Sequence, residues 1–341
     1  MSFFTLRRFC GSLALGFVAS PLFRGVAVAL CESASGPSAS ISADGQINHI
    51  FDNVPAPTKE ELEYVKTWGI PWVDEWDRPG ARGIRSDRST AHLRQIIMIR
   101  HGQYENEATE DDSIRRLTPL GEKQARATGV YLRKLFEESE KKKQLLAVYT
   151  AARAAYQKVK KEDDAPEKES AALQRMMQAD LAVRGAGGIF VDGAPRFVHV
   201  SNMVRARQTA DLILEAFPAE VQRALDVDPQ LQERFPCDVE PKREFHATVE
   251  DMKAAEEVFE RYFHRPTSDE SSVEIIVGHG NVIRYLTMRA LQLPPEAWLR
   301  TSLPHCSVTT ITIRGTGHVS LVGMGSYGHL PPELVTAVNL P

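Results

Sequence analysis

The sequence predicts an α/β protein: a three-layer sandwich in which a mostly parallel central sheet carries helices on both faces. Two observations lead to this fold class. Short apolar runs rich in β-branched residues, at residues 96–99, 197–200, 275–277 and 309–313, are typical of strands buried on both faces. Helical patterns follow the first three runs, and this alternation of strand and helix is what a parallel sheet requires.

The first 31 residues have the composition of a targeting segment. They contain Arg7, Arg8 and Arg24 but no acidic residue, and an apolar run covers residues 9–23. A membrane-spanning helix needs about 20 apolar residues, and Arg24 interrupts this run. The basic start and short apolar core fit a secretory signal peptide, whereas the arginines and the lack of acids fit a mitochondrial presequence. Composition alone leaves both addresses open.

Residues 32–91 are predicted to form a flexible linker, because residues 33–42 are rich in serine, glycine and alanine. A short helix is expected at residues 59–66. Three tryptophans then crowd residues 68–77, among them Trp72 and Trp76, which Asp77 follows. Large aromatic side chains in a linker need a cover, since exposed aromatics mark contact surfaces. Either they pack on the main domain of the same chain, or they contact another molecule.

The strand at residues 96–99 leads directly into Arg100, His101 and Gly102. Glycine lets the backbone turn sharply, and ligands of open α/β sheets bind at the carboxyl ends of the strands. The planar guanidinium of arginine suits phosphate oxygens, and a neutral imidazole can attack phosphorus. Taken alone this tripeptide is weak evidence, because a histidine that ends a strand is more often structural.

The strand at residues 275–277 repeats the design with His279, Gly280 and an amphipathic helix that two prolines stop at residues 294–295. Between the two histidines, Arg205 falls near the start of a helix that follows the strand at residues 197–200. Free backbone amides and the helix dipole favour an anion there. We therefore expect His101, His279 and Arg205 to converge on one anion-binding pocket.

A helix is predicted over residues 117–136, with Thr118 as its N-cap and Pro119 at the first helical position. Residues 137–188 then read as a charged, mostly helical insertion in the main domain, which spans residues 92–330. We interpret its charge runs as a solvated face.

The strand at residues 309–313 alternates as an edge strand does, and a turn leads into a further strand at residues 319–322. Residues 331–341 are taken as a C-terminal tail. We assign His199, His246 and His305 to the core or the surface, although His305 and Ser307 lie on a loop that can border the pocket.

Composition excludes several other classes of protein. The chain has 341 residues and a formal net charge of −4, so no basic surface for nucleic acid is implied. The four cysteines are Cys10, Cys31, Cys237 and Cys306, and their spacing fits neither a zinc site nor a disulfide framework. We expect no metal and no other cofactor.

Several motifs in one order resemble the histidine phosphatase (phosphoglycerate-mutase-like) superfamily. They are Arg100-His101-Gly102, residues 117–125, residues 201–210 with Arg205, Leu231-Gln232-Glu233, and Gly278-His279-Gly280. Three further stretches, residues 103–104, 279–285 and 291–300, are similar to a subgroup of mitochondrial membrane-associated serine/threonine phosphatases. The match covers roughly two thirds of the chain and is more specific than any single pattern.

The resemblance implies a metal-independent serine/threonine-protein phosphatase. His101 would be the nucleophile that forms a phosphohistidine, and Arg100 and Arg205 would bind the phosphate. His279, if protonated, would stabilise the transition state, and Glu233 would act as general acid and then as general base. The alternatives are a phosphatase of small metabolites on the same scaffold and a mitochondrial multimeric adaptor with incidental catalysis.

The resemblance also implies partners and an address. Trp72, Trp76 and Asp77 are similar to a multimerisation motif of the subgroup, although Val73 stands where that motif has an aspartate. A homo-oligomer is therefore expected, with phosphoproteins as substrates. The address implied is mitochondrial, with the apolar N-terminal segment as a membrane anchor, and the alternative is the secretory pathway.

Overall fold

The computed structural model describes residues 40–41, 47–48, 72–73, 76–77, 92–105, 111–161, 166–267 and 270–337. The chain divides into two compact units, Met1–Gly69 and Ile70–Pro341. In the first unit, strands β1 (Ser40–Ile41) and β2 (Ile47–Asn48) form an antiparallel pair. The expected targeting segment at residues 1–31 and the expected helix at residues 59–66 lie outside the described residues.

The second unit is built on a six-stranded sheet in the order β5-β4-β6-β3-β7-β8. Its strands are β3 (Leu93–Arg100), β4 (Phe197–Ser201), β5 (Leu225–Asp228), β6 (Ser272–Gly278), β7 (Val308–Arg314) and β8 (Val319–Ser326). β3, β4, β5 and β6 are parallel, whereas β7 pairs antiparallel with both β3 and β8. The predicted mostly parallel sheet is confirmed. β3 and β6, the two strands that lead directly into the histidines, are neighbours in its centre.

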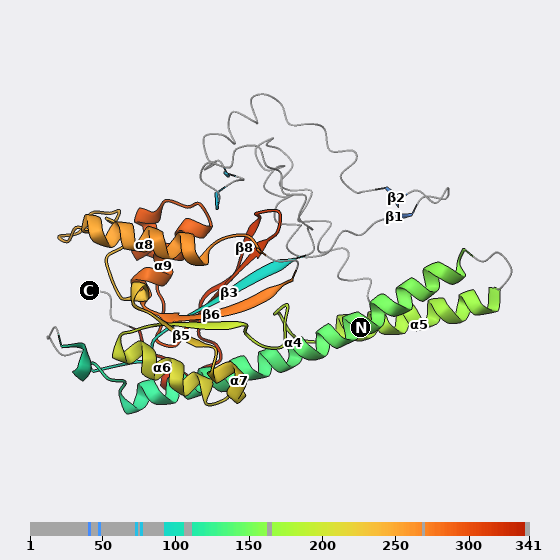
Figure 1. Cartoon of the computed structure of the whole chain (residues 1–341), viewed down its shortest axis with the longest axis horizontal. Helices are drawn as coiled ribbons and strands as arrows, with labels where there is room; N and C mark the ends of the chain where they lie inside the picture. Colours follow the sequence, from blue (N-terminus) through green and yellow to red (C-terminus); the bar gives the residue numbers. More distant parts are fainter. Residues whose placement is uncertain are drawn as a thin grey trace, which may run out of the picture. The chain divides into compact units, whose positions relative to one another are not determined.

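Helices cover both faces of this sheet (Figure 1). On β3, Ile97 and Ile99 belong to one apolar cluster, and Ile96 and Met98 belong to the other. The first cluster includes residues of α4 (Pro119–Val159) and α6 (Val204–Leu214). The second includes residues of α8 (Val249–Tyr262) and α9 (Gly280–Ala290). Alternate residues of one strand thus serve two cores, and the three-layer sandwich is confirmed.

Short helices complete the description: α7 (Ala219–Gln222), η2 (Asp112–Ile114), η3 (Pro229–Leu231), η4 (Pro295–Arg300) and η5 (Pro332–Leu334). Among the described residues, no helix combines the length and the apolar composition that crossing a membrane requires.

The helix predicted to end at residue 136 continues to Val159 as the single 41-residue helix α4. Its predicted start is confirmed: Thr118 Oγ1 accepts a hydrogen bond from the amide of Gly121 (3.1 Å), and Pro119 is the first helical residue. The predicted end is wrong because no glycine or proline occurs between residues 137 and 165 to stop the helix. α5 (Pro166–Gly185) then runs back along the second half of α4 (Figure 1). The insertion is a two-helix hairpin.

The alternating strand near the C-terminus is not an edge strand. β7 lies between β3 and β8, and β8 forms the edge of the sheet. The polar residues that suggested exposure are buried and hydrogen-bonded: Thr312 Oγ1 accepts from Gln95 Nε2 (3.3 Å), and Thr309 Oγ1 accepts from the amide of Gly325 (3.0 Å). The alternation of polar and apolar residues along β7 therefore comes from buried, hydrogen-bonded threonines. It does not indicate a face that contacts solvent.

Candidate active site

His101 lies at the carboxyl end of β3. Its amide donates to the carbonyl of Gly278 (2.9 Å), which joins it to the end of β6. The side chain is buried, and its Nδ1 lies 2.8 Å from the carbonyl oxygen of Gly102. A carbonyl only accepts hydrogen bonds, so Nδ1 carries the ring proton. Nε2 therefore keeps the lone pair that can attack phosphorus, and in the free pocket it accepts from Arg205 Nε (3.3 Å).

A close approach of two backbone segments fixes the turn after His101. A Cβ atom on Gly102 would lie 2.8 Å from the carbonyl oxygen of Gly121, and one on Gly121 would lie 1.9 Å from that of Gln103. Only glycine fits at such distances. The amide of Gly102 also donates to Thr209 Oγ1 (3.0 Å) on α6. The turn that carries His101 is thus held between the first turn of α4 and α6.

His279 faces His101 from the end of β6. The ring centroids are 5.1 Å apart, and His279 is fully buried. Its Nε2 lies 2.8 Å from Ser201 Oγ, which also accepts from the amide of Met203 (3.3 Å). We assign the Ser201 hydroxyl proton to the bond with Nε2 and the ring proton to Nδ1. In the described part of the chain Nδ1 has no hydrogen-bond partner, so in this tautomer it is a buried donor beside His101.

Two buried arginines complete the pocket. Arg205 lies in the first turn of α6, and its Nη1 is 3.0 Å from Asp112 Oδ1. Asp112 Oδ2 in turn accepts from the amide of Val204 (2.7 Å), which ties η2 to the start of α6. Arg100 donates from Nη1 to the carbonyl of Leu303, while its Nε has no partner among the described residues. Each guanidinium is therefore fixed on one side by the protein and keeps other donors for a ligand.

The pocket holds positive charge on the arginines and neutral imidazoles between them. Burial lowers the pKa of His101 and of His279 well below the usual value, and Arg100 and Arg205 act in the same direction. Burial also lowers the pKa of Arg100 to about 10, which leaves it charged at neutral pH. His279 is thus neutral in the free pocket and contributes a hydrogen-bond donor. A neutral His101 is the form that a nucleophile requires.

Glu233 follows η3 and is close enough to Arg100 and Arg205 for their charges to act on its carboxyl group. Burial raises the pKa of its carboxyl, and Arg100 and Arg205 oppose that shift. Its Oε1 accepts from the amide of Arg234 (3.3 Å). A carboxyl group whose pKa is raised can hold a proton at a pH where an ordinary glutamate is ionised, and this property suits a general acid.

The structure brings together every residue predicted for phosphate chemistry and adds three that the sequence did not assign to it. Tyr104 packs edge-on against His101, with ring centroids 5.0 Å apart, and stacks under the Arg205 guanidinium at 4.8 Å. Asp112 fixes Arg205, as described above. The His305 ring lies 5.8 Å from that of His101, so the loop expected to border the pocket does so. Tyr104 is adjacent to the histidine motif in sequence, whereas no local signal marks Asp112.

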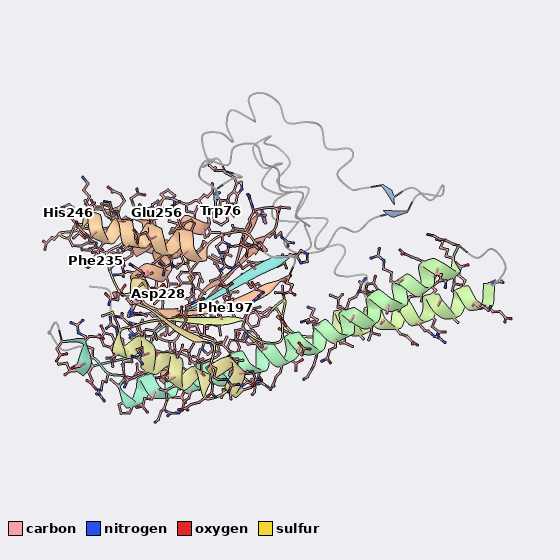
Figure 2. The ribbon with its side chains drawn as sticks, viewed as in Figure 1. Trp76, Phe197, Asp228, Phe235, His246 and Glu256 are labelled. Carbon is pink, nitrogen blue, oxygen red and sulfur yellow. The ribbon has the colours of Figure 1, made fainter. Side chains whose placement is uncertain are left out.

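The tryptophan segment packs on its own domain. Trp76 lies against α8 (Figure 2), where its ring is 5.9 Å from that of Phe259, and its Nε1 donates to the carbonyl of Gly317 (2.8 Å). Asp77 accepts from the amide of Arg265 (2.7 Å) and is fully enclosed with its guanidinium. Trp72 is 40% exposed. The alternative of packing within one chain is therefore confirmed for Trp76 and Asp77.

Comparisons with known proteins define the class. Residues 176–324 match the model of the histidine phosphatase superfamily (branch 1). The mitochondrial serine/threonine-protein phosphatase Pgam5 of Caenorhabditis elegans is 31% identical, and the match covers 80% of each chain. Pgam5 of Drosophila yakuba is 33% identical over 80% of this chain and 82% of its own. Among solved structures, phosphoglycerate mutase from Plasmodium falciparum is 26% identical, covers 72% of this chain and 98% of its own, and has a TM-score of 0.38.

Two imidazoles and two arginines around one pocket on a three-layer α/β sandwich define a phosphoryl-transfer enzyme of the histidine phosphatase class. The chain belongs to the histidine phosphatase superfamily, in the family of the mitochondrial serine/threonine-protein phosphatases just described. The expected family and the expected mitochondrial address are confirmed at that level. The superfamily match begins inside α5, so it contains Arg205, Glu233 and His279, while the helical hairpin separates Arg100 and His101 from it.

Proposed function

We propose that this chain is a serine/threonine-protein phosphatase that works through a phosphohistidine at Nε2 of His101. The observation that carries the proposal is the fixed tautomer of His101: Nδ1 is bound to the Gly102 carbonyl, and Nε2 lies between Arg205 and His279. The relatives are serine/threonine-protein phosphatases, and this supports phosphoserine and phosphothreonine in proteins as substrates.

In the first step, the Nε2 lone pair of His101 attacks phosphorus, and the bond from phosphorus to the serine or threonine oxygen breaks. Arg100 and Arg205 hold the phosphoryl oxygens, and Nδ1–H of His279 donates to one of them. The leaving alkoxide is strongly basic and takes the proton of Glu233 as it departs. The products are the dephosphorylated protein and phosphohistidine, with Glu233 ionised.

In the second step, a water molecule attacks the phosphohistidine, and the bond from phosphorus to Nε2 breaks. The Glu233 carboxylate accepts a proton from that water, which restores the acid, and inorganic phosphate leaves. Two cationic side chains, Arg100 and Arg205, act on His101 at the phosphate site. Arginines supply the charge that a metal provides in other phosphoryl-transfer enzymes, so we propose turnover without a metal.

The experiment compares hydrolysis of phosphothreonine peptides, phosphoglycerate and an aryl phosphate by the wild type and His101→Ala, with and without a chelator. We expect peptide hydrolysis that the chelator leaves intact and that His101→Ala abolishes. A labelled, acid-labile phosphoenzyme should form only in the wild type. Faster turnover of phosphoglycerate than of peptides would instead indicate a phosphatase of small metabolites, and full partner binding without turnover would indicate an adaptor.

We extend the proposal to membrane association through residues 1–31 and to a homo-oligomer. The apolar run at residues 9–23 supports the first, and the resemblance of Trp72, Trp76 and Asp77 to a multimerisation motif supports the second. Light scattering on the full chain tests the oligomer: Trp72→Ala should lower the mass of the assembly, because Trp72 is the more exposed of the two tryptophans. Flotation of the full chain and of a chain without residues 1–31 on mitochondrial-lipid vesicles tests the membrane association.

A further inference from the structure

His305 lies on the loop before β7, beside the nucleophile, and has no role in the steps above. Its side chain is buried, and its ring is 5.8 Å from that of His101. The next residue, Cys306, donates its amide to the carbonyls of Arg100 (3.1 Å) and His101 (3.3 Å). The loop is therefore tied to the catalytic turn by its backbone, which fixes the place of the His305 ring.

A hydrogen-bond chain from the C-terminal segment sets the tautomer of His305. Nδ1 lies 2.8 Å from Thr336 Oγ1, and the His305 amide donates to the Thr336 carbonyl (2.9 Å). Gln124 Nε2 donates to the same hydroxyl (2.8 Å), and its amide orientation is fixed because Oε1 accepts from the amide of Gln103 (2.9 Å). We assign the Thr336 hydroxyl proton to the bond with Nδ1. The ring proton of His305 is then on Nε2.

That Nε2–H is a donor with no protein acceptor. The atom is buried, and no hydrogen-bond partner for it occurs among the described residues; the same holds for Ser307 Oγ on the same loop. A buried donor without a partner costs free energy, so such an atom points to a ligand. Burial lowers the pKa of His305 to about 3, with Arg100 acting in the same direction, and the ring is neutral in the working pH range.

We propose that His305 is a third histidine of the phosphate pocket, which donates from Nε2 to a phosphoryl oxygen, and that Thr336 positions it. This inference rests on the proposed phosphoryl transfer at His101. If His305 has this role, residues 331–337 support the pocket, although the sequence predicts that they belong to a C-terminal tail. The segment reaches it through His305 and through Gln124 on α4, whose Nε2 also donates to the carbonyl of Leu334 (2.6 Å).

The first experiment measures inhibition by orthovanadate, a mimic of the transferring phosphoryl group, together with kcat and KM for an aryl phosphate. For His305→Asn we expect the inhibition constant to rise about tenfold, as for the loss of one hydrogen bond to a charged group. His199→Asn is the matched control, because His199 is a partly buried histidine bonded to Asp226 (3.2 Å) outside the pocket. It should leave vanadate inhibition unchanged.

The second experiment separates positioning from folding. Thr336→Val removes the hydroxyl at nearly constant volume, whereas Thr336→Ser keeps it. We expect Thr336→Val to weaken vanadate binding about as much as His305→Asn does, Thr336→Ser to restore it, and melting temperatures to stay close to that of the wild type. Nitrogen NMR of ¹⁵N-histidine protein should show the His305 proton on Nε2 in the wild type and in Thr336→Ser.

The results distinguish failure of this inference from failure of the proposed function. If the wild type hydrolyses the aryl phosphate through His101, but His305→Asn and Thr336→Val bind vanadate as the wild type does, His305 is not a phosphate ligand. A His305 proton found on Nδ1 in the wild type would overturn the role of Thr336. A wild type without hydrolysis, or a His101→Ala variant that keeps it, would contradict the proposed function itself.

Discussion

Two strands of the sheet end in the same way and give their histidines opposite properties. His101 directly follows β3 and His279 directly follows β6, and a glycine comes after each histidine. At His101 a backbone carbonyl binds Nδ1 and leaves the Nε2 lone pair for attack. At His279 the hydroxyl of Ser201 binds Nε2 and leaves Nδ1 as a donor. In the proposed mechanism the His101 ring forms a bond with phosphorus, and the His279 ring donates a hydrogen bond to a phosphoryl oxygen.

The difference arises from the partner of each ring and not from the local sequence. The partner of His101 is the carbonyl of the very next residue, whereas the partner of His279 is a serine 78 residues away. Both rings are neutral because burial and the arginines lower their pKa values. Two histidines with equal protonation can therefore have distinct roles when their hydrogen bonds select different tautomers.

The largest expected effect tests directly whether His101 and His279 have different roles. His101→Ala should lower kcat by about 10⁴-fold or more, because the nucleophile is lost, and should form no phosphoenzyme. His279→Ala should lower kcat by only about 10²–10³-fold, as for loss of one oxyanion donor, and should still form it. Acid-labile labelling with a phosphorylated peptide, alongside steady-state kinetics, measures both. Labelled His101→Ala protein, or His279→Ala protein that cannot be labelled at saturating substrate, would contradict the assignment of roles.

The next effect concerns pH. Since the pKa values of both histidines are lowered, neither should titrate near 6.5, and the alkaline limb should belong to Glu233. Activity on phosphothreonine peptides needs the protonated carboxyl, so kcat should fall as pH rises through the raised pKa of Glu233. Glu233→Gln should remove that limb and lower kcat on peptides by about 10²–10⁴-fold.

An aryl phosphate is the control for this prediction, since its phenolate leaves without a proton. The loss of kcat in Glu233→Gln should be much smaller with that substrate. An equal loss on both substrates would show that Glu233 acts on the phosphate or the fold and not on the leaving group.

A smaller effect tests how the tautomer of His279 is set. Ser201→Ala removes the hydroxyl that binds Nε2, so the ring proton can move there and Nδ1 ceases to be a reliable donor. We expect kcat/KM to fall about tenfold, the value of one hydrogen bond to a charged oxygen, with phosphoenzyme formation retained. Ser139→Ala is the matched control, because Ser139 is an equally buried serine on α4 whose Oγ donates to the carbonyl of Leu135. A Ser201→Ala enzyme as active as this control would remove Ser201 from the site.

The sequence could predict those parts of the site in which the residues that act together are close in the sequence. The strand, histidine and glycine of β3 and of β6 are consecutive, so local patterns were enough to predict both strand ends and the class of pocket. The tautomers depend on Ser201 and on backbone geometry, and the tie between Asp112 and Arg205 depends on the packing of η2 against α6. Such contacts exist only after the sheet has formed. Only the structure could reveal these contacts.

The same limit explains the errors at the level of elements. The first helix was predicted too short because the change to charged residues at 137 was interpreted as a boundary, although nothing there interrupts the backbone hydrogen bonds of α4. β7 was taken for an edge strand because threonines alternate along it. Its burial depends on β8 pairing with it across the turn, which is a tertiary event. Composition reports the chemistry of a segment, while its boundaries and its neighbours are set by packing.

Substitutions of the two glycines that follow the histidines should have the smallest effects. They compare the turn after His101 directly with the turn after His279. A Cβ on Gly102 would lie 2.8 Å from a backbone oxygen of Gly121, which cannot move without shifting α4. A Cβ on Gly280 would have Arg100 Nε as its nearest neighbour, at 3.4 Å, and this side chain can yield. Gly102→Ala should therefore lower the free energy of unfolding by about 1–3 kcal/mol, the usual range for overpacking.

Gly280→Ala should change the free energy of unfolding by less than about 0.5 kcal/mol, because alanine is a better helix former than glycine at the start of α9 and offsets the tight contact. Its effect should appear at the active site instead, as a weaker affinity for vanadate, since the added methyl group presses on Arg100, the arginine proposed to hold the phosphate. Urea unfolding and vanadate inhibition of the two variants measure both quantities. Equal destabilisation by the two substitutions would mean that the turn after His101 is no tighter than the turn after His279, and that the rigid placement inferred for the nucleophile is wrong.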